Sequence, residues 1–120
     1  MVEELRLPLI DGRVEAGFSG FPSPADDFIE RSLDLNEQLV ANPISTFFMR
    51  ASGHSIVSEG IHDGDLLIVD RSITPTLGSI VVAVINGELT VKRLDNQESK
   101  IVVWGVVTWS VHRLKTTCTR

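Results

Sequence analysis

Two residues of this chain, Ser55 and Lys92, have the types needed for a serine nucleophile and its general base. Ser55 lies in the segment 52–56, between an expected strand and a short turn or helix. At such a corner the serine hydroxyl can point outward while nearby backbone N–H groups form an oxyanion hole. Gly53 and His54 immediately precede the serine and are the candidates for this oxyanion or turn support.

Lys92 lies on an expected strand at 89–94. The alternation of a strand places Lys92 on one face together with Thr90 and Leu94, where partial burial is expected. Burial matters because only a neutral amine accepts the serine proton, and an ordinary lysine has a pKa near ~10.4. Desolvation lowers a lysine pKa by up to ~3–5 units. Spacing alone leaves open that the serine and the lysine are ordinary surface residues.

The elements that must position these two residues are mainly β. A chain of 120 residues forms one domain with a modest core. From Thr46 onward, apolar runs alternate with glycine-containing turns, and Asn86-Gly87 between two such runs is a strong hairpin signal. We expect a small antiparallel β domain, with strands at 47–51, 66–69, 80–85, 89–94, 101–107 and 108–114.

The N-terminal part of the chain has a different pattern. Residues 1–22 contain two prolines and three glycines and show no sustained period, which predicts a flexible, extended arm. Ser-Pro-Ala-Asp at 23–26 is typical of a helix start, and apolar residues within 28–40 recur at near-helical spacing. We therefore expect one or two short helices before the β domain, the second capped by Asp34.

Metal and cofactor chemistry has little support in the sequence. The three histidines and the single cysteine, Cys118, form no HExxH or CxxC motif, and a turn between strands explains the group His62, Asp63 and Asp65. The chain contains neither a Walker A loop nor a GxGxxG segment. We therefore expect no metal and no cofactor. One cysteine allows no intramolecular disulfide, which is consistent with a reducing cytoplasm.

The charge distribution argues against direct binding to DNA. Lys and Arg number 11 against 16 Asp and Glu, a net charge of −5. The basic residues of the tail, Arg113, Lys115 and Arg120, are too few for a DNA-binding surface and predict a solvated end. No apolar run approaches the length of a membrane span, about 18 residues or more. We expect a cytoplasmic protein that makes no contact with membranes and binds no specific DNA sequence.

Six segments of the chain carry a more specific signal. They are 21–28 (FPSPADDF), 32–36 (SLDLN), 51–56 (ASGHSI), 60–70 (GIHDGDLLIVD), 87–93 (GELTVKR) and 104–107 (WGVV). With these motifs the chain resembles the UmuD family, LexA-like self-cleaving proteins of the SOS response in peptidase family S24. The resemblance extends over 7–94 and 103–113. It implies a β fold of LexA and signal-peptidase type, with a cleavable arm at 1–22 and a Ser–Lys peptidase domain at 23–120.

The resemblance assigns roles by position. The family nucleophile matches Ser55, and the family general base matches Lys92. The family's self-cleavage bond falls in the arm, at Ala16–Gly17, or at Ser19–Gly20 when counted back from Phe21. The resemblance also implies a homodimer, stimulation of cleavage by a RecA–single-stranded DNA filament, and a role as accessory subunit of an error-prone translesion polymerase of the UmuC type.

The chain departs from the family pattern most notably in two places, besides Ile56 in place of Met and a tail after Arg113 that is not family-like. His54 stands where the family usually has Asp or Asn, and only eleven residues separate Lys92 from Trp104, where the family typically has a longer stretch. The second departure predicts a shortened β region. It leaves open a non-catalytic dimeric module that contacts a polymerase or RecA. A LexA-type regulator has the same catalytic domain, but 22 residues before it cannot hold a helix-turn-helix, so such a regulator would lack its DNA-binding domain.

Overall fold

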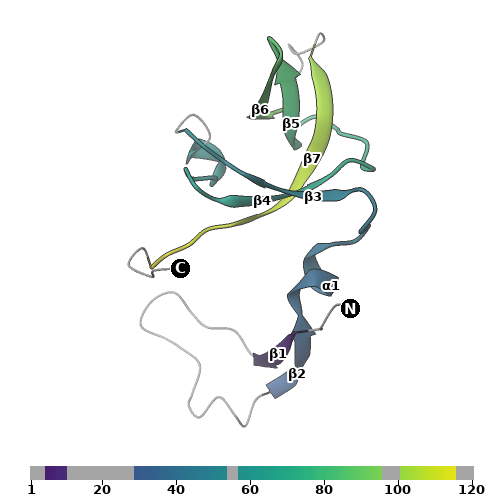
Figure 1. Ribbon diagram of the computed structural model, residues 1–120, viewed down its shortest axis with the longest axis vertical. Helices are drawn as coiled ribbons and strands as arrows, with labels where there is room; N and C mark the ends of the chain where they lie inside the picture. Colours follow the sequence, from purple (N-terminus) through teal and green to yellow (C-terminus); the bar gives the residue numbers. More distant parts are fainter. Residues whose placement is uncertain (1–4, 11–28, 54–56, 96–100, 116–120) are drawn as a thin grey trace. The chain divides into compact units, whose positions relative to one another are not determined.

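The computed structural model describes residues 5–10, 29–53, 57–95 and 101–115, and these are mainly β (Figure 1). All strand pairs are antiparallel, which confirms the expected fold class. The chain divides into two compact units, Met1–Gln38 and Leu39–Arg120. The boundary expected between residues 22 and 23 lies outside the described residues.

The N-terminal unit contains a two-stranded sheet. Strand β1 (Arg6–Ile10) pairs with β2 (Ile29–Asp34), and Leu7 lies opposite Leu33. The first expected helix is therefore wrong where the chain is described, because residues 29–34 form the partner strand of β1. Apolar spacing reports only the local pattern, and pairing with a strand distant in the sequence overrides it.

A short helix, α1 (Leu35–Leu39), directly follows β2 and confirms the helix expected after Asp34. The Asp34 carboxylate accepts a hydrogen bond from the backbone N–H of Asn36, with Oδ1 and N 3.0 Å apart. This contact satisfies one of the free N–H groups at the helix start. Arg6 and Glu37 form an ion pair that joins β1 to the helix.

The C-terminal unit is a five-stranded sheet in the order β3-β4-β7-β5-β6 (Figure 1). Its strands are β3 (Thr46–Arg50), β4 (Leu66–Asp70), β5 (Ile80–Ile85), β6 (Glu88–Arg93) and β7 (Val102–Val111). β7 is long and curved. Its first half pairs with β5 and its second half with β4. The two stretches expected at 101–107 and 108–114 are thus one continuous strand.

Strands β5 and β6 form the hairpin predicted from Asn86-Gly87. The φ angles of Asn86 (53°) and Gly87 (80°) are both positive, as a two-residue turn of type I′ requires. The register places Lys92 opposite Val81 and Thr90 opposite Ala83. Because paired residues of an antiparallel ladder share a face, Lys92 and Thr90 lie on the same side of the hairpin, as expected.

Two apolar clusters pack on the two faces of this sheet. One consists of Ala51, Ile61, Leu67, Val69 and Val82, and the other of Val81, Ala83 and Val106. The clusters lie on opposite faces because Val81 and Val82 are consecutive on one strand. No helix among the described residues is long and apolar enough to cross a membrane.

Candidate active site

Lys92, the candidate general base, is half-buried on β6. It lines a pocket together with Ser58 and Glu59, which belong to η2 (Val57–Glu59), a single 3₁₀ turn. Ser55 and His54 lie outside the described residues, as do both candidate cleavage bonds. The structure nevertheless brings Lys92 beside the turn that begins two residues after Ser55.

An ion pair holds this turn against β6. The Nε atom of Arg93 donates to both carboxylate oxygens of Glu59, at 2.8 and 2.6 Å, and Nη1 donates to the carbonyl of Gly78 at 2.8 Å. The hydrogen bond from Arg93 lowers the pKa of the Glu59 carboxyl, although burial acts in the opposite direction. The turn Val57–Glu59, which follows the segment 54–56, is therefore held next to Lys92.

The N-terminal side of the same segment is fixed by a turn. The Ala51 N–H donates to the Asp65 carbonyl, and the Gly64 N–H donates to the Ala51 carbonyl, both at 2.8 Å. Gly53 has a φ of 101° and donates its N–H to Asp63 Oδ1 at 2.8 Å. This hydrogen bond engages the Gly53 N–H within the turn.

Gly53 and Val57 are both described, and Ser55 is two residues from each. Both flanking residues take part in hydrogen bonds, and the turn that begins at Val57 contributes Ser58 and Glu59 to the pocket that Lys92 lines.

A second pocket lies beside the end of β3 and along β6. Its lining includes Met49, Ala51, Ser52, Leu89 and Val91. β6 is an outer strand of the five-stranded sheet. The pocket therefore places apolar side chains between the chain leading to the candidate nucleophile and the strand that carries the candidate base.

The turn expected at 62–65 is confirmed, since the Asp65 N–H donates to the His62 carbonyl at 3.0 Å. His112 is a third member of this group that the sequence did not predict, and its Nδ1 lies 2.6 Å from Asp65 Oδ1. Burial acts to raise the pKa of the Asp65 carboxyl, but the His62 N–H and the His112 ring lower it overall. Asp65 and His112 are neighbours because the register of β4 and β7 pairs Leu66 with Val111. This pairing joins distant parts of the sequence, so no local pattern could have predicted the contact.

Comparison with known proteins identifies the family. The profile of the Peptidase S24-like family matches residues 8–104. The chain belongs to this family. It is 44% identical to ImpA of Salmonella typhimurium in an alignment that covers 90% of this chain and 85% of ImpA. It is 42% identical to MucA of Escherichia coli over 88% of this chain and 84% of MucA.

A third relative, SamA of Salmonella typhimurium, is 39% identical over 92% of this chain and 88% of SamA. The LexA repressor of Photobacterium profundum is also 39% identical over 85% of this chain, which corresponds to only 50% of the repressor. ImpA, MucA and SamA are UmuD-family proteins, so the resemblance found in the sequence is confirmed. The chain is a UmuD-like SOS mutagenesis protein of a serine peptidase family.

Proposed function

We propose that this chain is a serine endopeptidase that cleaves its own N-terminal arm, with Ser55 as nucleophile and Lys92 as general base. The observation that carries the proposal is the pocket that half-buried Lys92 shares with Ser58 and Glu59, just after Ser55. Membership of the S24-like family supports it. So do the anchored ends of the segment 54–56, because a nucleophile needs a fixed position relative to its base.

In the proposed reaction, Ser55 Oγ attacks the carbonyl carbon of Ala16 as the Lys92 amine accepts the hydroxyl proton. Backbone N–H groups of the segment that includes His54 stabilise the oxyanion. The C–N bond to Gly17 then breaks, and Lys92 returns the proton to the leaving amine. Water hydrolyses the acyl-enzyme with Lys92 again as base. Cleavage at Ser19–Gly20 follows the same steps.

The substrate of this reaction is part of the same chain, so its effective concentration is high. A Ser–Lys dyad with a low intrinsic rate is therefore sufficient for cleavage. We infer that the arm binds in extended form along β6. β6 is an outer strand of the described sheet, where an extended peptide can add to the edge, and the adjacent pocket of Met49, Leu89 and Val91 supplies apolar contacts.

The proposed biological role follows from the UmuD-like family membership. In this scheme the chain forms a homodimer, and a RecA–single-stranded DNA filament stimulates cleavage of the arm. The shortened dimer then serves as accessory subunit of an error-prone translesion polymerase of the UmuC type. These partners recognise protein surfaces, and no step requires a cofactor.

Intact-mass spectrometry of the purified full chain, incubated from pH 7 to pH 10, tests the proposal. We expect a fragment that begins at Gly17 or Gly20, and a cleavage rate that rises with pH because a general-base lysine acts only when neutral. The fragment is absent in Ser55→Ala and in Lys92→Ala. Lys115→Ala is the matched control and cleaves like the unaltered chain, since its exposed side chain lies in the tail.

Two results would contradict the dyad. A fragment of the same mass in Ser55→Ala would show that another residue, or another protease, cuts the arm. A folded protein that yields no fragment at any pH, even with the RecA–single-stranded DNA filament present, would favour the non-catalytic binding module instead.

A further inference from the structure

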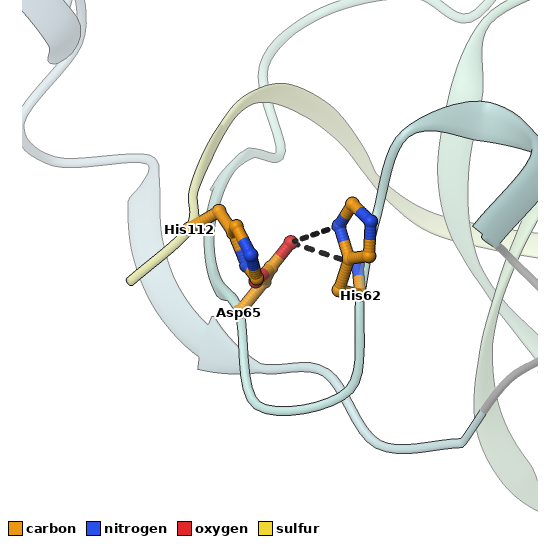
Figure 2. A group of neighbouring side chains, drawn as sticks. All are labelled: His62, Asp65 and His112. Atoms are coloured by element: carbon orange, nitrogen blue, oxygen red, sulfur yellow. Dashed lines mark hydrogen bonds and ion pairs between the residues drawn. The ribbon is translucent and has the colours of Figure 1, made fainter. Parts of the chain in front are cut away.

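Asp65 is a buried carboxylate held between two imidazole rings (Figure 2). Its side chain is 1% exposed, whereas those of His62 and His112 are 46% and 42% exposed. His112 Nδ1 lies 2.6 Å from Asp65 Oδ1, and His62 Nδ1 lies 3.7 Å from Asp65 Oδ2. The ring centroids of the two histidines are 4.4 Å apart. Three side chains of metal-ligating type therefore converge, with the carboxylate inside and both rings at the surface.

The backbone fixes the carboxylate at the centre of this group. The His62 N–H donates to Asp65 Oδ2 at 2.8 Å, and the Asp65 carbonyl accepts the Ala51 N–H at 2.8 Å. On the other side, the register of β4 and β7 places His112 next to Asp65. The arrangement is thus built by the sheet and the turn, and a ligand that uses it meets a largely formed site.

We propose that His62, Asp65 and His112 bind a divalent transition-metal ion of the zinc type. Two imidazole nitrogens and one carboxylate oxygen are a donor set that zinc prefers, with water in the fourth position. Magnesium and calcium prefer sites made of oxygen ligands alone, so this donor set selects against them.

The distances between donor atoms suit such an ion after small ring movements. The three ligand atoms all lie within 4.8 Å of one another. Zinc bonds of ~2.0–2.2 Å in tetrahedral geometry place two ligand atoms roughly 3.4 Å apart. His112 Nδ1 and Asp65 Oδ1 are 2.6 Å apart without the ion, so the His112 ring must move away from Asp65 by under about one ångström to reach the separation around zinc. Both rings are half-exposed and can turn, while the buried carboxylate stays in place.

Binding would cross-link two distant parts of the C-terminal unit. His112 directly follows β7, and the other two ligands lie in the turn before β4. The same turn contains Asp63, which accepts the Gly53 N–H. The ion would thus stabilise the turn that holds Gly53, and binding does not itself require cleavage of the arm.

Metal titration of the untagged full chain tests this site. We expect Zn²⁺ to bind at one ion per chain by isothermal titration calorimetry, and Co²⁺ to give the visible absorption of a tetrahedral centre. Saturating Zn²⁺ raises the Tm because it binds the folded chain preferentially. Mg²⁺ at the same concentration leaves the Tm unchanged.

Single substitutions assign the ligands. His62→Gln and His112→Gln each weaken Zn²⁺ binding at least ~tenfold, as expected for loss of one direct ligand. His54→Gln is the matched control, because it removes the remaining histidine of the chain and leaves the affinity unchanged. Circular dichroism checks that each variant is folded. An unaltered chain that binds no Zn²⁺ overturns the proposal, and so does binding that survives the double substitution His62→Gln/His112→Gln.

Discussion

Asp70 is a carboxylate whose charged form depends on hydrogen bonds from its neighbours. It is buried and accepts hydrogen bonds from the Ser45 hydroxyl, from the N–H and hydroxyl of Ser72, and from the Asn42 amide. The Ser45 and Ser72 donors, with a smaller effect from Asn42, hold the pKa of the Asp70 carboxyl well below its usual range, although burial opposes them. The charged form is therefore the one that the fold stabilises.

This network predicts how stability depends on pH. Because the folded pKa is depressed, the stabilisation is present above the ordinary aspartate pKa of ~3.9 and is lost as pH falls through the folded value. We expect Asp70→Asn to lower the Tm by roughly 5–10 °C at pH 7. The difference from the unaltered chain shrinks as the pH falls below about 4. Calorimetric scans from pH 7 to pH 2 measure this Tm difference, with Glu88→Gln, a substitution of an exposed carboxylate, as the control. A Tm difference that does not change with pH would exclude the hydrogen-bond network of Asp70 as its cause.

Arg93 is a positioning residue in the proposed mechanism, because it acts through Glu59 on the turn after Ser55. Arg93→Gln removes the ion pair in which Nε donates to the Glu59 carboxylate, and we expect it to lower the self-cleavage rate about tenfold through misplacement of the nucleophile. The pKa of Glu59 is lowered by Arg93, so their contact is present above an ordinary glutamate pKa of ~4.3 and is intact from pH 7 to pH 10.

The dependence of the self-cleavage rate on pH therefore distinguishes the positioning role of Arg93 from the general-base role of Lys92. Arg93→Gln should reduce the rate equally across this range and keep the rise with pH, whereas Lys92→Ala, which lacks the base, yields no fragment at any pH. Mass spectrometry measures the fragment in each variant, and Arg113→Gln controls for the lost charge. An Arg93→Gln variant that cleaves at the unaltered rate would show that the ion pair does not position the turn.

At the scale of elements, β7 depends on close approach to β4. Gly105 is buried on β7, and a Cβ atom added there would lie 2.7 Å from Cγ1 of Val69. Such a contact is far shorter than normal van der Waals separation, and Val69 is fully buried, so one strand must shift. We expect Gly105→Ala to lower the free energy of unfolding by about 1–3 kcal/mol in urea denaturation.

A double-mutant cycle tests the cause. Val69→Ala removes the methyl groups that the new Cβ meets, so Gly105→Ala should cost clearly less in that background. Equal costs in the two backgrounds would mean that the destabilisation comes from another contact.

The elements that the sequence predicted correctly are those encoded locally. Asn86-Gly87 fixes its own positive φ angles, and Asp34 caps α1 within two residues. The strand at Ile29–Asp34 was mistaken for a helix because its partner, β1, is distant in the sequence. The candidate site also combines features that the local sequence encodes with features that depend on long-range pairing. The face of Lys92 follows from alternation, whereas the meeting of Asp65 and His112 requires the β4–β7 register, which no local pattern encodes.

At the scale of the whole molecule, the C-terminal unit exposes an apolar stripe on one face of its sheet. Phe48 on β3 and Trp109 on β7 flank buried Ile68 on β4, all three in register. Phe48 is 56% and Trp109 45% exposed, and Val111 on the same strand is also exposed. Adjacent large apolar side chains on a soluble protein are typical of an interaction surface. This stripe is where we expect the proposed homodimer to form.

Sedimentation equilibrium of the purified chain tests the stripe. We expect a dimer at micromolar concentration, and a folded monomer for Trp109→Lys, because a charge at the centre of an apolar interface is costly to bury. The fluorescence of Trp109 should shift toward shorter wavelength as the dimer forms and its ring leaves water. Val102→Lys places the same charge on an exposed valine at the opposite end of β7 and should leave the dimer intact. If Val102→Lys dissociates the dimer while Trp109→Lys does not, the interface lies at the β5–β6 end of the sheet. The partner subunit would then compete for the β6 edge with the arm, which we propose to bind there.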